Sequence, residues 1–417
     1  MKPSEAEDRL LALELFGMRF GLERMQRLTT ALGDPQRRFR SIHVVGTNGK
    51  SSTTRMIEAI LARHGLRVGA YTSPHLISFN ERIRVSDADI TPQQFADAIE
   101  RSLRAAAWVN RAGDPDDPVT QFELLTAAAY WELARQGVEA AVIEAGLGGR
   151  YDATNVIPSE VQVLTSVGLE HTRWLGPTVA AIAREKLDVV QPGATLILGA
   201  GLHPDAEAIA VEIAEQRDAR IVHAELDPHA RVGALGAFQR RNFAVARAAA
   251  EALLGELDES AVVDAAAAVR VPGRLQVIGE QPLTLLDGAH NPEGVAALVE
   301  SMPELVGAGR LVAVISVLED KDAATMLAEL APICDAVVLT ASHNPRALPP
   351  PTLASLLQQI APDSGARTET IRDPELALAR ARELAGADGV VLATGTIYLV
   401  GELLAGQLGV IRKASTI

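Results

Sequence analysis

The chain has 417 residues, a formal net charge of −14, 48% hydrophobic residues and 22% charged residues. This length and composition predict two folded domains, and the negative charge argues against a general binder of nucleic acid or of anionic membranes. The N-terminus is polar and acidic and no run of about 18 apolar residues occurs, so we expect a cytoplasmic protein with no membrane span. The single cysteine, Cys334, excludes an internal disulfide.

Short apolar runs alternate with longer alanine- and leucine-rich amphipathic stretches along the chain. This alternation predicts α/β architecture with parallel sheets. The expected strands are 42–45, 140–144, 161–167, 195–198, 284–287, 311–316, 336–340 and 389–394, and the expected helices include 52–64, 92–104, 122–136, 178–189 and 239–254. Residues 110–118 are expected to form an exposed loop. The pattern breaks at residues 271–274, which predicts a domain boundary there.

The stretch 42–53, IHVVGTNGKSST, has the features of a phosphate-binding loop. Such a loop needs glycines that let backbone N–H groups approach phosphate oxygens, a lysine, and a helix N-terminus. Gly46 and Gly49 bracket a turn, Lys50 follows, and residues 51–53 supply hydroxyls and an expected helix cap. The eight-residue phosphate-loop pattern begins with glycine where this chain has Val44, so a simple strand-to-helix turn stays open as the alternative.

Two further predicted strands end in polar residues. Glu144 ends the strand 140–144 and precedes a glycine-rich loop, while His171 follows the strand 161–167. Open α/β sheets bind ligands at the carboxyl ends of their strands, and a carboxylate there suits Mg²⁺. A turn carboxylate and a structural histidine are the alternatives, but the convergence of three strand ends favours a ligand site.

Six motifs occur along the chain in the same order as in a known protein family. They are GTNGK at 46–50, TSPHL at 72–76, EAGLGGR at 144–150, HT at 171–172, EK at 185–186 and DGAHNP at 287–292. Together they resemble bacterial folylpolyglutamate synthase/dihydrofolate synthase, within the Mur ligase superfamily, from about Leu15 to about Gly401. The resemblance implies a phosphate-loop ATPase-like domain with a mostly parallel sheet in residues 1–271. It also implies a smaller Rossmann-like domain on the glutamate side in residues 272–417, and a monomer.

The activity implied by the resemblance is ATP-dependent amide ligation. In that family ATP phosphorylates a carboxylate of dihydropteroate or of a reduced folate, and the amine of L-glutamate attacks the acyl phosphate. Charge develops on the transferred phosphoryl group, which explains the need for Mg²⁺, a lysine and backbone donors. A UDP-muramoyl peptide ligase and an ATP-binding protein without ligase activity stay open as alternatives. The segments TQF at 120–122 and GRYDATN at 149–155 favour folate.

The resemblance also implies roles for individual residues. The nucleotide would be held by Gly46, Thr47, Asn48, Gly49, Lys50, Ser51, Ser52, Asn242, Arg274, Asp287 and His290. The metal ligands would be Ser73, Glu144, His171 and Lys186, with Lys50, His171 and Lys186 as the catalytic residues. The substrates would be bound by Thr120, Phe122, Asp152, His343, Arg346 and Tyr398. The implied cofactors are ATP and Mg²⁺ at two sites, with a monovalent cation as a further candidate.

Some of these positions have alternatives from the residues alone. Lys186 lies on a predicted helix, where a solvated surface lysine is the ordinary interpretation; the resemblance instead implies a carbamylated lysine that binds a second Mg²⁺. Phe122 either stacks on the pterin ring or packs in the core, and Asp152 would accept hydrogen bonds from pterin N–H groups. Whether Ser51 or Ser52 faces the metal stays open.

Overall fold

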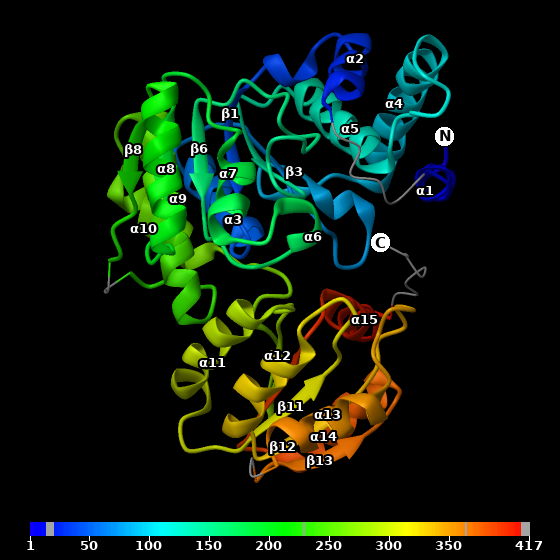
Figure 1. Cartoon of the computed structure of the whole chain (residues 1–417), viewed down its shortest axis with the longest axis vertical. Helices are drawn as coiled ribbons and strands as arrows, with labels where there is room; N and C mark the ends of the chain where they lie inside the picture. The colour runs from blue at the N-terminus through cyan, green and yellow to red at the C-terminus, as the bar shows by residue number, and fades with distance from the viewer. Residues whose placement is uncertain (14–20, 228–229, 363–364, 410–417) are drawn as a thin grey trace. The chain divides into compact units, whose positions relative to one another are not determined.

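The computed structural model describes residues 1–13, 21–227, 230–362 and 365–409, so Leu15, where the resemblance begins, lies outside the described residues. The chain divides into two compact units (Figure 1). Unit 1 comprises Met1–His75, Phe79–Val232 and Arg240–Val269. Unit 2 comprises the chain from Arg270 onward and two short earlier segments, Leu76–Ser78 and Gly233–Gln239.

Unit 1 is built on an eight-stranded sheet in the order β4-β3-β2-β5-β1-β6-β7-β8. Its strands are β1 (Arg40–Val45), β2 (Val68–Tyr71), β3 (Ile83–Val85), β4 (Ala88–Asp89), β5 (Ala140–Glu144), β6 (Val161–Leu164), β7 (Thr195–Leu198) and β8 (Arg220–His223). Strands β3 and β4 pair antiparallel and the others pair parallel. Because β1 lies between β5 and β6, the carboxyl ends of these three strands meet at one edge of the sheet.

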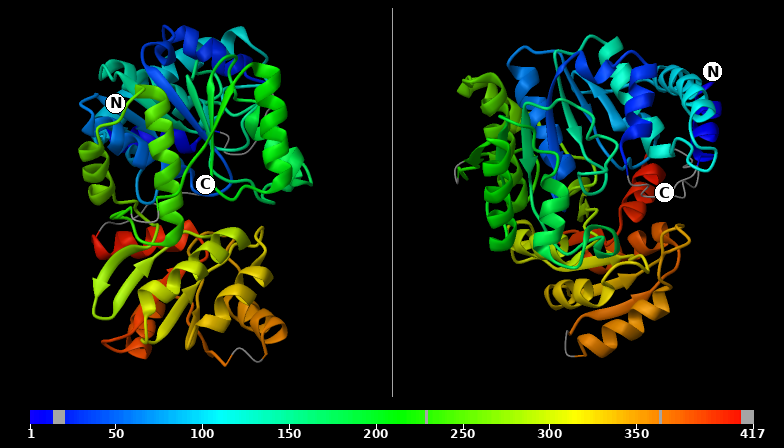
Figure 2. Two further views of the ribbon diagram at one scale, coloured as in Figure 1. Left: turned by 90° about the vertical axis from the view of Figure 1, so that its left-hand side faces the viewer. Right: turned by 45° about the horizontal axis from the view of Figure 1, so that its top comes forward.

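Helices cover both faces of the sheet in unit 1 (Figure 2). They are α1 (Pro3–Leu11), α2 (Glu23–Ala31), α3 (Lys50–Arg63), α4 (Pro92–Ala112), α5 (Gln121–Arg135), α6 (Thr172–Leu175), α7 (Val179–Leu187), α8 (Pro204–Arg217), α9 (Ala237–Leu254) and α10 (Glu259–Ala268), with short 3₁₀ turns η1 (Pro35–Arg37) and η2 (Phe79–Arg82). Alternate residues of β5, Ala141 and Ile143, join a core with α4 and α5. A second core joins β6 and β7 to α7 and α8. Because successive side chains of a strand point to opposite faces of the sheet, the strands contribute core residues beneath both layers of helices.

Unit 2 contains a six-stranded sheet in the order β13-β12-β11-β14-β10-β9. Its strands are β9 (Gln276–Glu280), β10 (Leu283–Leu286), β11 (Leu311–Ile315), β12 (Ala336–Leu339), β13 (Arg367–Thr370) and β14 (Val390–Thr394). Its helices are α11 (Pro292–Val306), α12 (Ala323–Leu330), η3 (Ala331–Ile333), α13 (Pro350–Ile360), α14 (Pro374–Ala385) and α15 (Ile397–Gln407). Only β9 pairs antiparallel among these described strands. Leu311, Ala313 and Ile315 face the core of α11–α13, and the residues between them face that of α14 and α15.

The prediction of α/β architecture with mostly parallel sheets is confirmed in both units. Strand β6, however, ends at Leu164 rather than at residue 167. The strand ends there because the residues after Leu164 contact the loop that follows β1. In this contact the backbone N–H of Thr47 donates to the carbonyl of Ser166 at 2.9 Å. Helix α4 also continues through Ala112, into the loop expected at 110–118.

The predicted hydroxyl cap at the start of α3 is wrong. The helix begins at Lys50, its N-cap is Gly49 with a φ of 86°, and no side chain caps it. A left-handed N-cap residue without a side chain leaves the first N–H groups of the helix uncovered, as an anion-binding loop requires. In the part of the chain described here, no helix is long and apolar enough to cross a membrane.

Candidate active site

The loop between β1 and α3 depends on two glycines. Gly46 and Gly49 both have positive φ angles, 152° and 86°. A Cβ atom on Gly46 would lie 1.9 Å from Thr165 Oγ1, and one on Gly49 would lie 2.6 Å from Asn242 Oδ1. The positive φ angles favour glycine at both positions, and the backbone of Ser166, 3.1 Å from a Cβ atom on residue 46, also restricts the space there. The second contact brings Asn242, a predicted nucleotide residue, directly beside this loop.

The loop is fastened by the polar residues that follow β6. The N–H of Asn48 donates to Ser166 Oγ at 2.9 Å, and Thr165 Oγ1 donates to the carbonyl of Asn48 at 2.6 Å. The N–H of Gly168 donates to Thr47 Oγ1 at 3.0 Å. No role is predicted from the sequence for Thr165, Ser166 or Gly168. The signal for them was the polar run that directly follows a buried strand next to β1.

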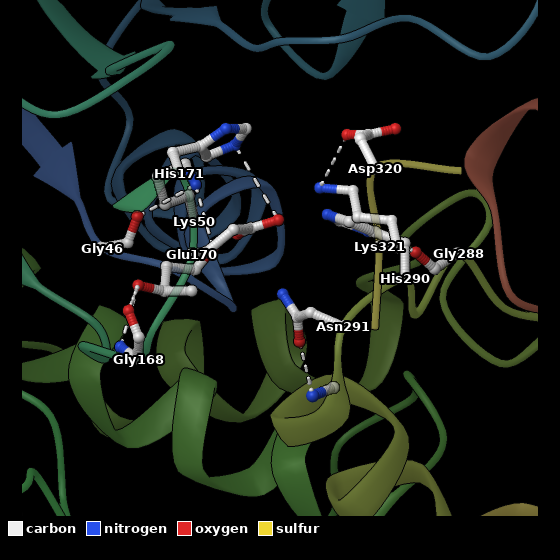
Figure 3. Close-up of polar contacts among 12 residues, drawn as sticks. Gly46, Lys50, Gly168, Glu170, His171, Gly288, His290, Asn291, Asp320 and Lys321 are labelled. Carbon is white, nitrogen blue, oxygen red and sulfur yellow. Dashed lines mark hydrogen bonds and ion pairs between the residues drawn. The ribbon is translucent and has the colours of Figure 1, made fainter. Parts of the chain in front are cut away.

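Two lysines share one backbone carbonyl in this site. Lys50 Nζ donates to the carbonyls of Gly46 at 3.0 Å and Thr47 at 3.1 Å, so its side chain folds back over the loop (Figure 3). Lys186 Nζ donates to the same Gly46 carbonyl at 2.8 Å. Lys186 is only 5% exposed, and burial, followed by the charge of Lys50, lowers its pKa to about 7. The interpretation of Lys186 as a solvated surface lysine is therefore wrong.

The glycine-rich loop after β5 holds the end of α7 in place. A Cβ atom on Gly149 would lie 2.4 Å from the carbonyl oxygen of Lys186, so the two backbones are in direct contact. The N–H of Arg150 donates to the carbonyl of Glu185 at 2.9 Å. The Arg150 guanidinium also pairs with Glu185 at 3.3 Å and with Asp188 at 3.5 Å. This loop thus sets the position from which Lys186 reaches the phosphate loop.

Glu144, the last residue of β5, brings two serines together. Its Oε1 accepts a hydrogen bond from Ser51 Oγ at 2.8 Å, and its Oε2 accepts one from the N–H of Ser73 at 3.1 Å. Ser52 is 2% exposed and is buried in α3. Between Ser51 and Ser52, Ser51 is therefore the residue whose hydroxyl contacts the predicted metal-binding carboxylate of Glu144.

His171 is the N-cap residue of the short helix α6 and has a φ of 53°. Its Nε2 lies 3.8 Å from Glu170 Oε1 (Figure 3). Among the described residues no group of three or more His, Cys, Asp or Glu side chains could hold a metal ion. The predicted set contains only two such residues, and its remaining donors, a serine hydroxyl and a carbamylated lysine, are oxygen ligands of the kind Mg²⁺ takes.

Two of the three predicted pterin-side residues, Phe122 and Asp152, contact the same glycine-rich loop. Thr120 caps α5 in a capping box with Glu123, and Phe122 packs its ring against Gly146, where a Cβ atom would lie 2.5 Å from Phe122 Cζ. Asp152 is 6% exposed and accepts hydrogen bonds from the N–H groups of Leu147 at 2.7 Å and Thr154 at 3.0 Å. Their contacts with a substrate stay predictions, because each also has a defined local role.

In unit 2, the predicted nucleotide residues gather at the carboxyl end of β10. Asp287 accepts hydrogen bonds from the N–H groups of Leu275 at 2.9 Å and Ala289 at 2.8 Å. Burial raises the pKa of Asp287, and the nearby positive charge of Arg274 opposes that rise. A Cβ atom on residue 288 would lie 2.2 Å from Arg274 Nη1, so Gly288 leaves room for the guanidinium. His290 Nδ1 lies 2.9 Å from the Gly288 carbonyl (Figure 3).

The remaining predicted substrate residues follow parallel strands of unit 2: His343 and Arg346 lie after β12, and Tyr398 lies in the first turn of α15, after β14. The side chain of His343 is 75% exposed and its Nδ1 lies 3.0 Å from Glu402 Oε2. Arg346 Nη1 lies 3.3 Å from Asp320 Oδ1, and Lys321 Nζ lies 3.9 Å from Asp320 Oδ2 (Figure 3). Tyr398 is 8% exposed at the start of α15. Strands β12, β11 and β14 are adjacent and parallel, which explains why the segments that follow them share one edge of the sheet.

Comparison with known proteins gives concordant findings. Residues 273–397 match the family described as "Mur ligase, glutamate ligase domain". The chain is 31% identical to the Bacillus subtilis dihydrofolate synthase/folylpolyglutamate synthase over 93% of its own length and 95% of the relative. It is 34% identical to a Haloferax volcanii protein described as a probable bifunctional folylpolyglutamate synthase/dihydropteroate synthase, but spans only 50% of that protein.

Solved structures give the same result over both units. A Mycobacterium tuberculosis folylpolyglutamate synthase complexed with ADP is 30% identical, with a TM-score of 0.90 and 99% of each chain covered. The structure described as "E.coli FolC in complex with DHPP and ADP" is 28% identical, with a TM-score of 0.87 and 98% of each chain covered. The prediction of the family from the six ordered motifs is confirmed, and the chain belongs to the folylpolyglutamate synthase/dihydrofolate synthase family of Mur-type ligases.

Proposed function

We propose that this protein is an ATP- and Mg²⁺-dependent ligase that joins L-glutamate to dihydropteroate and to the γ-carboxylate of reduced folates. The observation that carries the proposal is the group formed by Lys50, Ser51 and Glu144 at the adjoining ends of β1 and β5. It combines a lysine, a helix N-terminus and a metal-binding carboxylate, which are the parts that phosphoryl transfer requires. Relatives described with bound ADP and with DHPP support the same assignment.

The nucleotide phosphates would be bound by the amides of residues 46–52 and by the ammonium of Lys50. Helix α3 has 14 residues, so the partial positive charge of its N-terminus adds to that of the lysine. Asn242 contributes a polar group beside Gly49. In unit 2 we assign Arg274, Asp287 and His290 to the nucleotide as well, because a guanidinium suits bidentate phosphate contact and the other two adjoin it.

The metal site would use Ser73, Glu144 and His171, with the Ser51 hydroxyl orienting the Glu144 carboxylate. Mg²⁺ bound there supplies charge neutralisation on the transferred phosphoryl group. Lys186 would join a second Mg²⁺ site as a carbamate, formed when its uncharged amine nitrogen adds to the carbon of CO₂ and releases a proton. Burial beside Lys50 favours the uncharged amine that this addition needs.

The ligation itself would take two displacements. A carboxylate oxygen of the folate attacks the γ-phosphorus of ATP, the bond to the β-phosphate oxygen breaks, and ADP leaves. The amine of L-glutamate then attacks the acyl carbon, inorganic phosphate leaves, and the nitrogen loses a proton. Lys50 would stabilise the phosphoryl oxygens in the first step. We assign the folate site to residues 1–271 and the glutamate site to residues 272–417, with His343, Arg346 and Tyr398 as the glutamate contacts.

The test is glutamate-dependent ADP release by the purified protein with three acceptors: dihydropteroate, tetrahydrofolate and a UDP-muramoyl substrate. We expect turnover with the first two and none with the third. Turnover only with the UDP-muramoyl substrate would replace the folate assignment by that of a peptidoglycan-type ligase. ATP binding without turnover on any acceptor would favour the non-ligase alternative.

We expect Ser51→Ala to raise the Mg²⁺ concentration needed for half-maximal activity by about tenfold, because a side chain that orients a metal ligand typically contributes that much to metal affinity. Ser51 Oγ bonds Glu144 directly, whereas Ser52 is buried in α3. Ser52→Ala is therefore the matched control and should leave the Mg²⁺ dependence nearly unchanged. A larger shift for Ser52→Ala than for Ser51→Ala, measured by Mg²⁺ titration of ADP release, would reverse the assignment.

A further inference from the structure

A chain of three buried side chains runs from the middle of the sheet in unit 1 to the glycine-rich loop. His43, on the central strand β1, places Nε2 2.8 Å from Thr154 Oγ1. Thr154 Oγ1 in turn forms a short hydrogen bond with Asp152 Oδ1. His43 and Thr154 are both 0% exposed and Asp152 is 6% exposed. None of the steps proposed for ligation uses His43 or Thr154.

The N–H groups of Leu147 and Thr154 donate to the two oxygens of Asp152, which favours its ionised form and gives the hydrogen bonds of this chain one direction. An ionised Asp152 has no proton to donate, so the Thr154 hydroxyl donates to it. The oxygen of that hydroxyl then accepts from His43, which fixes the ring proton on Nε2. The other nitrogen, Nδ1, is buried and has no hydrogen-bond partner. Burial lowers the pKa of His43 to about 3, which agrees with a neutral ring.

The far end of the chain holds the loop that carries the predicted site residues. The second oxygen of Asp152 accepts from the N–H of Leu147 at 2.7 Å, next to Gly146, against which Phe122 packs. Tyr130 OH donates to the carbonyl of Thr154 at 2.9 Å, which connects this set of hydrogen-bonded side chains to α5. A rotation of the Asp152 carboxylate would therefore displace the backbone at Leu147 and the surface beside Phe122.

We propose that His43 is a positioning residue for the pterin-bearing substrate, acting through Thr154 on Asp152. The proposal rests on the proposed function, since it takes the surface at Phe122 and Asp152 to be the pterin site. An apolar side chain at position 43 would remove the cost of a buried Nδ1 without a partner. What the imidazole adds is a donor that keeps the Thr154 hydroxyl aimed at the carboxylate.

The experiment measures kcat and the KM values for dihydropteroate, ATP and glutamate in paired variants. Thr154→Val removes the hydroxyl at nearly constant shape, and Thr154→Ser retains it. His43→Leu removes the donor, and His43→Gln keeps an N–H near the position of Nε2. We expect the KM for dihydropteroate to rise about tenfold in Thr154→Val and in His43→Leu, the size expected for one buried hydrogen bond to a charged acceptor. Thr154→Ser and His43→Gln should recover most of this loss, with the KM for ATP nearly unchanged.

The double variant His43→Leu/Thr154→Val should be little worse than either single one, because both changes break the same chain. Additive effects, equal rises in all three KM values, or equal behaviour of Thr154→Val and Thr154→Ser would overturn the role of His43. Thermal unfolding checks that each variant is folded at the assay temperature. If His43→Leu does not fold, equal KM values for dihydropteroate in Thr154→Val and Thr154→Ser still overturn the role of His43, because that role acts through the Thr154 hydroxyl. Absence of wild-type turnover with dihydropteroate would instead reject the proposed function itself.

Discussion

Lys50→Ala is expected to lower glutamate-dependent ADP release by about a thousandfold while the protein stays folded, which is the scale seen when one preorganised charge-stabilising donor is removed. Lys50 Nζ donates hydrogen bonds to the carbonyls of Gly46 and Thr47 on the phosphate loop. Its loss therefore removes positive charge at the transferred phosphoryl group and little packing. Steady-state ADP release and thermal unfolding of the same preparation measure the two effects separately.

Two further variants test whether the ammonium of Lys50 is the group that the reaction uses. Lys50→Met keeps most of the aliphatic side chain and should be as inactive as Lys50→Ala, because the ammonium is what the reaction uses. Lys2→Ala removes an exposed lysine elsewhere in unit 1 and should leave turnover unchanged. Retention of more than about a tenth of the wild-type rate in Lys50→Ala would contradict a direct role on the phosphates.

Lys186→Met is expected to abolish ligase activity and, in CO₂-free buffer at pH 7, to raise the free energy of unfolding by about 3 kcal/mol. The amine is buried, and burial together with Lys50 lowers its pKa from 10.5 to about 7. At about 1.4 kcal/mol per pH unit, that difference sets an upper limit of about 5 kcal/mol. The lost hydrogen bond to the Gly46 carbonyl offsets about 1 kcal/mol of the gain.

The stability difference between Lys186→Met and the wild-type protein should depend on pH in a defined direction. Between about pH 7 and pH 10.5 the unfolded chain holds a proton on Lys186 that the folded chain does not, so wild-type stability falls as the pH is lowered through this window. The methionine variant lacks this proton. Its stability advantage should therefore be largest near pH 7 and should vanish toward pH 10.5, as measured by urea unfolding at several pH values. Lys2→Met, at an exposed position, should show no such difference.

A stability difference between Lys186→Met and wild type that does not change with pH would contradict the buried, weakly basic amine. The carbamate adds a second readout. Bicarbonate should increase the activity of the CO₂-depleted wild-type enzyme, and mass spectrometry under native conditions should detect the added mass on Lys186. Full wild-type activity after complete CO₂ depletion would argue against the carbamate while leaving the pKa of the amine unaffected.

The short edge strands show where sequence reasoning was weakest. Strand β13, with the sequence RTET, has no apolar residue, and it is a strand because β12 offers it a parallel partner. Strands β3 and β4 have three and two residues and pair as an antiparallel edge. Neither has an alternation of apolar and polar residues long enough to identify it. By contrast, β7 matches the predicted strand at both ends, because its apolar run is sharply bounded.

The local order of residues by itself determined the α/β architecture, the glycine turn with Lys50, and Glu144 at a strand end next to it. These features depend on spacing within about ten residues and on the rule that parallel strands end at one edge. Only the tertiary structure decided that Gly49 rather than a hydroxyl caps α3, that Ser51 contacts Glu144, and that Lys186 reaches the Gly46 carbonyl. Lys186 and Gly46 are separated by 140 positions in the chain. Such a contact follows from the packing of the glycine-rich loop on α7, and burial then changes the chemistry of an ordinary lysine in a way that no local pattern encodes.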